Sequence, residues 1–474
     1  MKEQNNAFLV TKPVGALMRG YALPCVLSLL TGALYNIVDQ LFIANASYLG
    51  SAGNAANTVV FPLTVIALGI AVMLGDGCCA FFSLSLGGGE KAKAKRSVGN
   101  AVGLCLGLSF VLTAVYLICA DPILALFGAG VNARVLSLSR EYFFWITLGI
   151  PFYMFGQAMN PIIRADGSPR FAMCSTLAGA FLNVILDPIF IFGYFGVPRM
   201  GVAGAAIATV IGQIVAGTAA CIINLKANTE IHLRIKGFRP DGKIIGLIYE
   251  VGIPSIIMQS IGSVMTYGMN KILLGFSSTA AAVFGVYFKL QSFIFMPVFG
   301  LNNGMVPIIA YNYGAGKRER LIKTLKLSIL YAVILMLIGF LVFQVMPDSL
   351  LGLFDASETM LAIGRPALRI ISISFLLAGF SIVCGSMFQA LGNGVYSMLV
   401  SIARQLIVLL PVAYLLSRTG NIDMVWWAFP IAELVSGGLT IFFLVRIYRN
   451  VIVHISEPEH ETAQDSQSIQ SVSL

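Results

Sequence analysis

The sequence predicts an all-α integral membrane protein with twelve transmembrane helices in two parallel repeats of six helices. Three observations predict this fold class: an extreme composition, twelve long apolar stretches, and similarity between the two halves of the chain. Of the 474 residues, 58% are hydrophobic and only 11% are charged, whereas soluble proteins have about 25% charged residues. This composition excludes a soluble enzyme, a disordered chain and, despite a net charge of +9, a nucleic-acid-binding protein.

The membrane spans follow from the apolar stretches, because a helix needs about 20 apolar residues to cross the hydrocarbon core. The stretches predict spans over 22–43, 55–86, 97–120, 141–163, 171–193, 201–225, 247–275, 280–313, 327–346, 367–390, 398–416 and 425–448. The second and the eighth are too long for a straight minimal span. We expect these two helices to tilt, kink or project from the membrane.

The positions of Lys and Arg predict the orientation. With the N-terminus inside, 21 of the 30 Lys and Arg residues lie in inside segments, and only Arg134, Arg140, Arg199, Arg365 and Arg418 lie in outside loops. Lys and Arg accumulate in cytoplasmic loops of membrane proteins. The sequence therefore predicts a multi-pass protein of a bacterial inner (plasma) membrane with both termini in the cytoplasm.

The second half of the chain repeats the first. LGGGEK at 86–91 matches YGAGKR at 313–318, RADGSP at 164–169 matches QALGNG at 389–394, and ATVIGQIVAG at 208–217 matches AFPIAELVSG at 428–437. The matches keep one order with a slowly drifting offset. Each half has an even number of spans, so the repeats are parallel, which is a transporter pattern.

The repeats and the charge pattern predict the domain organisation. We expect an N-terminal six-helix lobe over 1–225, a cytoplasmic linker over 226–246 and a C-terminal six-helix lobe over 247–450. The remaining segment, 451–474, becomes polar and acidic and rich in Ser and Gln, which is typical of a disordered cytoplasmic tail.

Two carboxylates inside the first lobe form the main candidate site, because an ionisable residue within a span is costly and often functional. Counting along spans one and five places Asp39 and Asp187 at a similar height in the outer half of the membrane, with Asn183 one turn below Asp187. Thr209 and Tyr142 reach the same region from spans six and four. Two nearby carboxylates cannot both stay ionised at low cost, so the group suits a proton relay or an oxygen-ligated Na⁺ ion bound by Asp39, Asn183, Asp187 and Thr209. The alternative is that the two carboxylates only hold helices together.

Of the other charged residues and prolines within the spans, three charged residues and one proline are further candidates. Lys289 and Glu433 lie at similar heights in spans eight and twelve, so they are candidates for an ion pair or a substrate contact in the second lobe. Arg404 lies near the start of span eleven and is expected at the cytoplasmic interface. Pro24 in span one is a candidate hinge, because proline removes a backbone hydrogen bond and permits a bend.

Motifs of enzymes are missing from the sequence. The segment GGGEKAK lacks the GxxxxGK[ST] pattern of nucleotide hydrolysis, and the three His residues are scattered. We therefore expect no catalytic residue, no metal cluster and no cofactor. Active transport would then depend on an ion gradient, with H⁺ or Na⁺ as the coupling ion.

The chain resembles the multidrug and toxic compound extrusion (MATE) transporters, and among them the bacterial DinF-like branch. The stretches that carry the resemblance lie in both lobes: LYNIVDQLFIA at 34–44, NVILDPIFIFG at 183–193, GVAGAAIATVIGQ at 201–213, KLQSFIFMPVFGLNNG at 289–304 and NYGAGKRER at 312–320. The resemblance implies two lobes around a central cavity and ion coupling at Asp39, Asn183 and Asp187, with Tyr142 and Thr209 as further members. Spans seven and ten lack the acids of the NorM-like branch.

The sequence thus favours an ion-coupled antiporter that exports organic, mostly cationic compounds by alternating access. The partners expected are small organic substrates and the lipid bilayer, with no nucleic acid, and the protein is expected to work as a monomer. A flippase for a lipid-linked saccharide of the same superfamily is the alternative, but it would need more basic residues in its cavity. A channel or a structural membrane protein is a third interpretation, which the carboxylates oppose.

Overall fold

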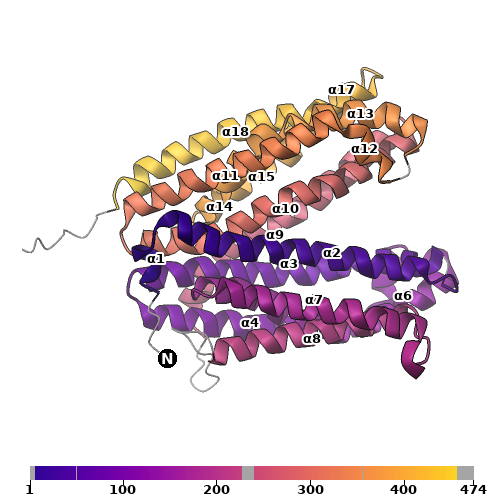
Figure 1. The fold of residues 1–474 in the computed structure, drawn as a ribbon, viewed down its shortest axis with the longest axis horizontal. Coiled ribbons are helices and arrows are strands. Elements are labelled where there is room, and N and C mark those ends of the chain that lie inside the picture. Colours follow the sequence, from indigo (N-terminus) through magenta and orange to yellow (C-terminus); the bar gives the residue numbers. More distant parts are fainter. Residues whose placement is uncertain (1–5, 50, 227–239, 355, 456–474) are drawn as a thin grey trace, which may run out of the picture.

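The computed structural model describes residues 6–49, 51–226, 240–354 and 356–455. Long helices run side by side along the longest axis of the molecule, and the two halves of the chain form two adjacent groups (Figure 1). The linker predicted at 226–246 and the tail predicted at 451–474 lie largely outside the described residues.

The first half contains six long helices joined by short elements. The long helices are α2 (Val14–Asn45), α3 (Ser51–Gly87), α4 (Lys91–Ile118), α6 (Ala133–Ala165), α7 (Pro169–Phe192) and α8 (Val202–Lys226). The short elements are α1 (Phe8–Thr11), α5 (Ala120–Leu126), η1 (Ala129–Val131) and η2 (Tyr194–Gly196).

The second half repeats this arrangement with more interrupted helices. It contains α9 (Gly242–Leu274), α10 (Ser278–Gly314), α11 (Arg318–Val345), α12 (Pro347–Gly352), α13 (Glu358–Ser372) and α14 (Phe375–Ala390). It continues with α15 (Gly394–Ile402), η3 (Ala403–Leu409), α16 (Leu410–Ser417), α17 (Ile422–Trp426), α18 (Ala428–Ile447) and η4 (Tyr448–Ile452). Both η3 and η4 are π-helical.

The helices confirm the predicted all-α fold with twelve spans. Among the described residues, ten continuous helical stretches are long and apolar enough to cross a membrane, and the pair α13 and α14, bent by 49°, makes an eleventh. The remaining long helix, α6, has 33 residues, packs along α3, α4 and α8, and lies at the position of the fourth predicted span. Six spans lie in each half, as the repeat predicts.

The two halves meet mainly through α2 and α3 of the first lobe and α9 and α10 of the second. The two longest helices, α3 and α10, have 37 residues each and correspond to the overlong predicted spans. A Cβ atom at Gly87 would clash with the carbonyl oxygen of Tyr311, and one at Gly314 would clash with that of Leu84. Because both positions are glycine, the ends of α3 and α10 pack backbone against backbone.

This crossing lies at the end of the bundle that carries the first and last described residues, which is at the left in Figure 1. We call it the basic end, because most of the Lys and Arg residues that the structure describes lie there. The segment around α1 also joins the lobes at this end: Arg320 of α11 donates to the carbonyl oxygens of Leu9, at 3.0 Å, and Lys12, at 2.5 Å, while Asn6 packs against Gly167 of the first lobe. The lobes are therefore in close contact at the basic end.

Candidate functional site

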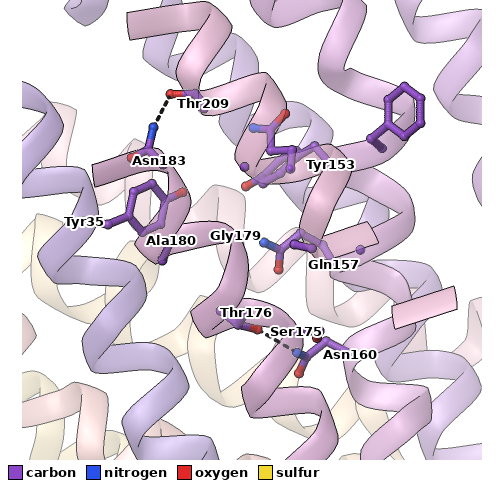
Figure 2. A pocket seen from close by; sticks show the side chains of 15 residues that line it. Tyr35, Tyr153, Gln157, Asn160, Ser175, Thr176, Gly179, Ala180, Asn183 and Thr209 are labelled. Atoms are coloured by element: carbon purple, nitrogen blue, oxygen red, sulfur yellow. Dashed lines mark hydrogen bonds between the residues drawn. The ribbon is translucent and has the colours of Figure 1, made fainter. Parts of the chain in front are cut away.

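The candidate site depends on a close crossing of α7 and α8. A Cβ atom at Gly179 would lie 2.6 Å from the carbonyl oxygen of Gly212, and one at Gly212 would lie 2.7 Å from that of Gly179. No other residue fits here without separating the helices. About one turn further from the basic end, Asn183 Nδ2 donates to Thr209 Oγ1 at 3.2 Å (Figure 2). The two glycines thus place the two polar side chains within hydrogen-bonding distance.

Two carboxylates complete the cluster. Asn183 Nδ2 also donates to Asp187 Oδ1 at 3.2 Å on the same face of α7, as expected for residues four apart in a helix. Asp187 is 0% exposed and Asp39 on α2 is 7% exposed. Electrostatic interactions link Asp187 to Asp39, and link the buried Tyr142 of α6 to both. The structure therefore brings together the five side chains that the sequence singled out.

The cluster has more acceptor atoms than donors. Asp39 Oδ1, Asp187 Oδ2 and Asn183 Oδ1 are buried and have no hydrogen-bond partner in the described part of the chain. Such atoms cost free energy unless a proton, a cation or water satisfies them. The arrangement can bind H⁺ on a carboxylate or hold Na⁺ among oxygen ligands. No group of three His, Cys, Asp or Glu side chains suited to a resident metal occurs among the described residues.

A cavity of about 70 Å³ extends from this cluster through the interior of the first lobe. Its wall is formed by α2, α6, α7 and α8 and includes amide, hydroxyl and phenol groups: Tyr35, Tyr153, Gln157, Asn160, Thr176 and Gln213. These uncharged residues were not among the candidates predicted from the sequence. Their helical spacing was the available signal, since Gln157, Asn160 and Arg164 recur every three or four residues along α6.

A second cavity of about 470 Å³ lies between α2 and α7. It is mostly apolar and is lined by Leu34, Val38, Leu177, Phe181 and Val184, among others. Tyr35 and Ala180 line both cavities. An apolar pocket thus lies next to the helices that carry Asp39 and Asp187.

The ion pair predicted between Lys289 and Glu433 is wrong. Glu433 is 5% exposed and pairs with Arg404, whose Nη1 atom lies 3.3 Å from Glu433 Oε2. Lys289 is exposed and lies over the ring of Phe354, at 5.7 Å from the centroid. The predicted depth of Arg404 was too shallow, because α15 begins at Gly394 rather than at 398. Arg404 therefore lies a turn further along its helix than predicted, within the π-helical segment η3, and its side chain is only 26% exposed.

Pro24 lies within α2, which continues on both sides of it. The nearby residues Ala22 and Val26 pack against Gly304 and Gly300 of α10. The candidate hinge is therefore at the contact between the two lobes, and its role as a hinge stays a prediction.

Known proteins of one kind match this chain over nearly its whole length. The model of the MatE family matches residues 24–189 and 254–415. The multidrug export protein MepA of Staphylococcus aureus (strain MRSA252) is 28% identical over 439 residues, which cover 91% of this chain and 94% of that protein. MepA of Staphylococcus saprophyticus is 26% identical and covers 94% of this chain and 97% of its own.

Solved structures share the same fold. The MATE multidrug transporter DinF-BH is 33% identical, with a TM-score of 0.86 over 96% of this chain and all of that chain (100%). An outward-facing MATE transporter of the MOP superfamily is 24% identical, with a TM-score of 0.87 over 95% of this chain and 99% of its own. With a family model that matches well over half of its residues and a 33% identical structure along its length, the chain belongs to the MATE family of membrane transporters, as the resemblance to DinF-like members predicted.

Proposed function

We propose that this transporter exports organic, mostly cationic compounds in exchange for H⁺ or Na⁺ by alternating access. The names of the relatives support export of drugs, since MepA is a multidrug export protein and DinF-BH is a multidrug transporter. The observation that carries the ion coupling is the buried pair Asp39 and Asp187, whose unpartnered oxygen atoms can accept a proton or bind a cation.

The exchange follows from the charge of this cluster. When H⁺ or Na⁺ binds, the negative charge between α2 and α7 falls, and the energy available for a conformational change is the difference in ion affinity between two conformations. Pro24 gives α2 a point at which it can bend. Ion binding at Asp39 can therefore alter the surface that α2 presents to the substrate.

The apolar cavity between α2 and α7 is the proposed substrate pocket. Its volume of about 470 Å³ and apolar lining suit a drug-sized molecule. The carboxylates beside it favour a positively charged substrate, which competes with H⁺ or Na⁺ for the same negative charge. A flippase for a lipid-linked saccharide is less well supported, because Arg404 is paired with Glu433 and gives no free basic group for a diphosphate.

We further propose that the basic end faces the cytoplasm of a bacterial cell, so that both termini lie on the cytoplasmic side of the plasma membrane. We also propose that a single chain is the working unit. The charge distribution supports this orientation. Cysteines introduced at the exposed Lys95 and Lys323 should be protected from an impermeant thiol reagent in intact cells, whereas one at the exposed Thr419 should react. Labelling in the reverse pattern would exclude this orientation.

The function is tested in proteoliposomes with a panel of dyes and with H⁺ and Na⁺ gradients imposed separately. We expect an inward-directed gradient of one of the two ions to drive dye efflux, and dye to drive the opposite flux of that ion. A protein that moves dye at the same rate without any gradient would contradict ion coupling.

A further inference from the structure

A column of polar side chains runs through the interior of the first lobe. It begins at the ion cluster, and no step of the proposed exchange uses the side chains beyond that cluster. Figure 2 shows Asn183 and Thr209 at one end of the cavity, Tyr153 and Gln157 in the middle, and Thr176 and Asn160 at the other end. At that far end Asn160 donates to Thr176 Oγ1 at 3.0 Å. The column starts at the ion cluster and runs along α6 and α7 toward the basic end.

Charged groups continue the column beyond the cavity. Arg164, one turn after Asn160 on α6, donates through Nη1 to Asn160 Oδ1 at 2.7 Å. Arg164 interacts electrostatically with Asp76 of α3. Its Nε atom is buried and has no partner among the described residues. Hydrogen-bonding groups therefore extend from Asp187 to the end of α6 at the basic end.

The cavity has the volume that water requires, and polar groups lie on its wall. A buried water needs about 10–15 Å³ and two to four polar partners, so a cavity of about 70 Å³ can hold roughly five waters. Gln213 Oε1, on its wall, is buried without a partner in the described structure. An amide oxygen of this kind can accept from water or coordinate Na⁺.

The second lobe lacks this arrangement among its described residues. Gly179 and Arg404 lie at equal distances along the chain from the first residues of α7 and α15, so they correspond in the two repeats. The matched segments at 208–217 and 428–437 align Gln213 with Glu433. Two positions that line the cavity in the first lobe thus hold a charge pair in the second.

We propose that the polar column is a hydrated path through the first lobe, by which the coupling ion travels between the Asp39 and Asp187 cluster and the basic end without entering the space between the lobes. This inference rests on the proposed ion coupling. A proton would move by transfer between waters, so that each proton released by a carboxyl group at one end is matched by one delivered near Arg164 and Asp76 at the other. A Na⁺ ion would exchange carboxylate ligands for the amide oxygens of Gln213 and Gln157.

The path gives the substrate and the ion separate routes. While the lobes remain in contact at the basic end, the substrate has no passage there, but an ion can leave through the first lobe. Gln157 and Gln213 are then positioning residues for water or the ion, and neither contacts the apolar pocket between α2 and α7.

The test replaces the two glutamines with leucine, which has a similar size and no hydrogen-bonding group. We expect Gln213→Leu and Gln157→Leu to bind dye at equilibrium like the wild type, and to slow dye-driven ion flux in proteoliposomes about tenfold or more. H⁺ and Na⁺ are followed in separate experiments, which identify the ion. Gly156→Ala is the matched control: it lies on the same wall, its added Cβ would meet nothing closer than 3.7 Å, and it removes no polar group.

The outcomes separate this inference from the proposed function. Wild-type ion flux in both glutamine variants, together with lost flux in Asp39→Asn, would overturn the path and leave the ion coupling intact. Absence of ion flux in the wild type would overturn both.

A second measurement needs no variant. Water in the cavity should make Tyr153 react in millisecond X-ray hydroxyl-radical labelling, whereas Tyr287, buried among aromatic rings in the second lobe, should not. Equal protection of the two tyrosines would contradict a hydrated path.

Discussion

At the scale of single residues, Arg404 and Glu433 form the buried ion pair of the second lobe. Glu433 Oε1 also accepts from Ser436 Oγ at 3.3 Å, so its carboxylate has two partners. Tyr287 interacts electrostatically with both charged groups. Because Glu433 is nearly inaccessible to water, the loss of its cationic partner leaves a charge that solvent cannot stabilise.

We expect each single replacement of this pair to be more harmful than the double replacement. Breaking a buried pair typically costs about 3–5 kcal/mol, and the partial exposure of Arg404 favours the lower end of that range. Arg404→Met and Glu433→Gln should each lower the thermal stability of the purified transporter, and the combined variant should recover part of the loss. Additive losses in this double-mutant cycle would show that the two groups are not coupled.

Single residues also show what the sequence could predict. Asp39 and Asp187 were found because carboxylates are rare inside spans and because depth along a helix can be counted. The ion pair of Arg404 with Glu433 could not be predicted by counting residues along the helix. The direction of Arg404 depends on the π-helical segment Ala403–Leu409, and its depth on a helix start four residues before the apolar stretch.

At the scale of helices, hydropathy predicted the spans but not the bend between α13 and α14. The bend between α13 and α14 falls at Ile373 and Ser374, where the sequence has neither proline nor glycine. Ser372 Oγ donates to the carbonyl oxygen of Arg369 at 3.0 Å, and Ser374 Oγ donates to that of Ile371 at 2.7 Å. Serine side chains that bond to the preceding turn compete with the helix and often bend it.

The crossing of α3 and α10 at the basic end gives a prediction for these two helices. In Gly87→Ala the new methyl group would clash with backbone at Tyr311, so the ends of the helices must separate. Overpacking of this kind costs about 1–3 kcal/mol, which should disfavour the conformation that is closed at the basic end. Spin labels at Lys95 and Lys323 should then report longer distances between the lobes. Gly107→Ala, where a Cβ meets nothing within 4 Å, is the control; an unchanged distance distribution in Gly87→Ala would contradict the prediction.

At the scale of the whole molecule, the two repeats share one fold but differ in their chemistry. The first lobe holds two carboxylates with unpartnered oxygens and a polar cavity, whereas the second lobe holds a compensated ion pair. The repeat was visible in the sequence because it preserves glycine turns and helix lengths. The polar cavity was not, because it arises only when α6, α7 and α8 pack together. We therefore assign the proposed ion coupling to the first lobe.

The measurement that tests this assignment most directly is gradient-driven dye efflux alongside equilibrium dye binding in Asp39→Asn. The substitution preserves the shape of the side chain and removes its ionisable group, as permanent protonation would. We predict a folded protein that binds dye but no longer couples efflux to the gradient, while Asp121→Asn, at an exposed ion pair with Arg140 in the same lobe, keeps wild-type coupling. Normal gradient-coupled efflux in Asp39→Asn would contradict the assignment.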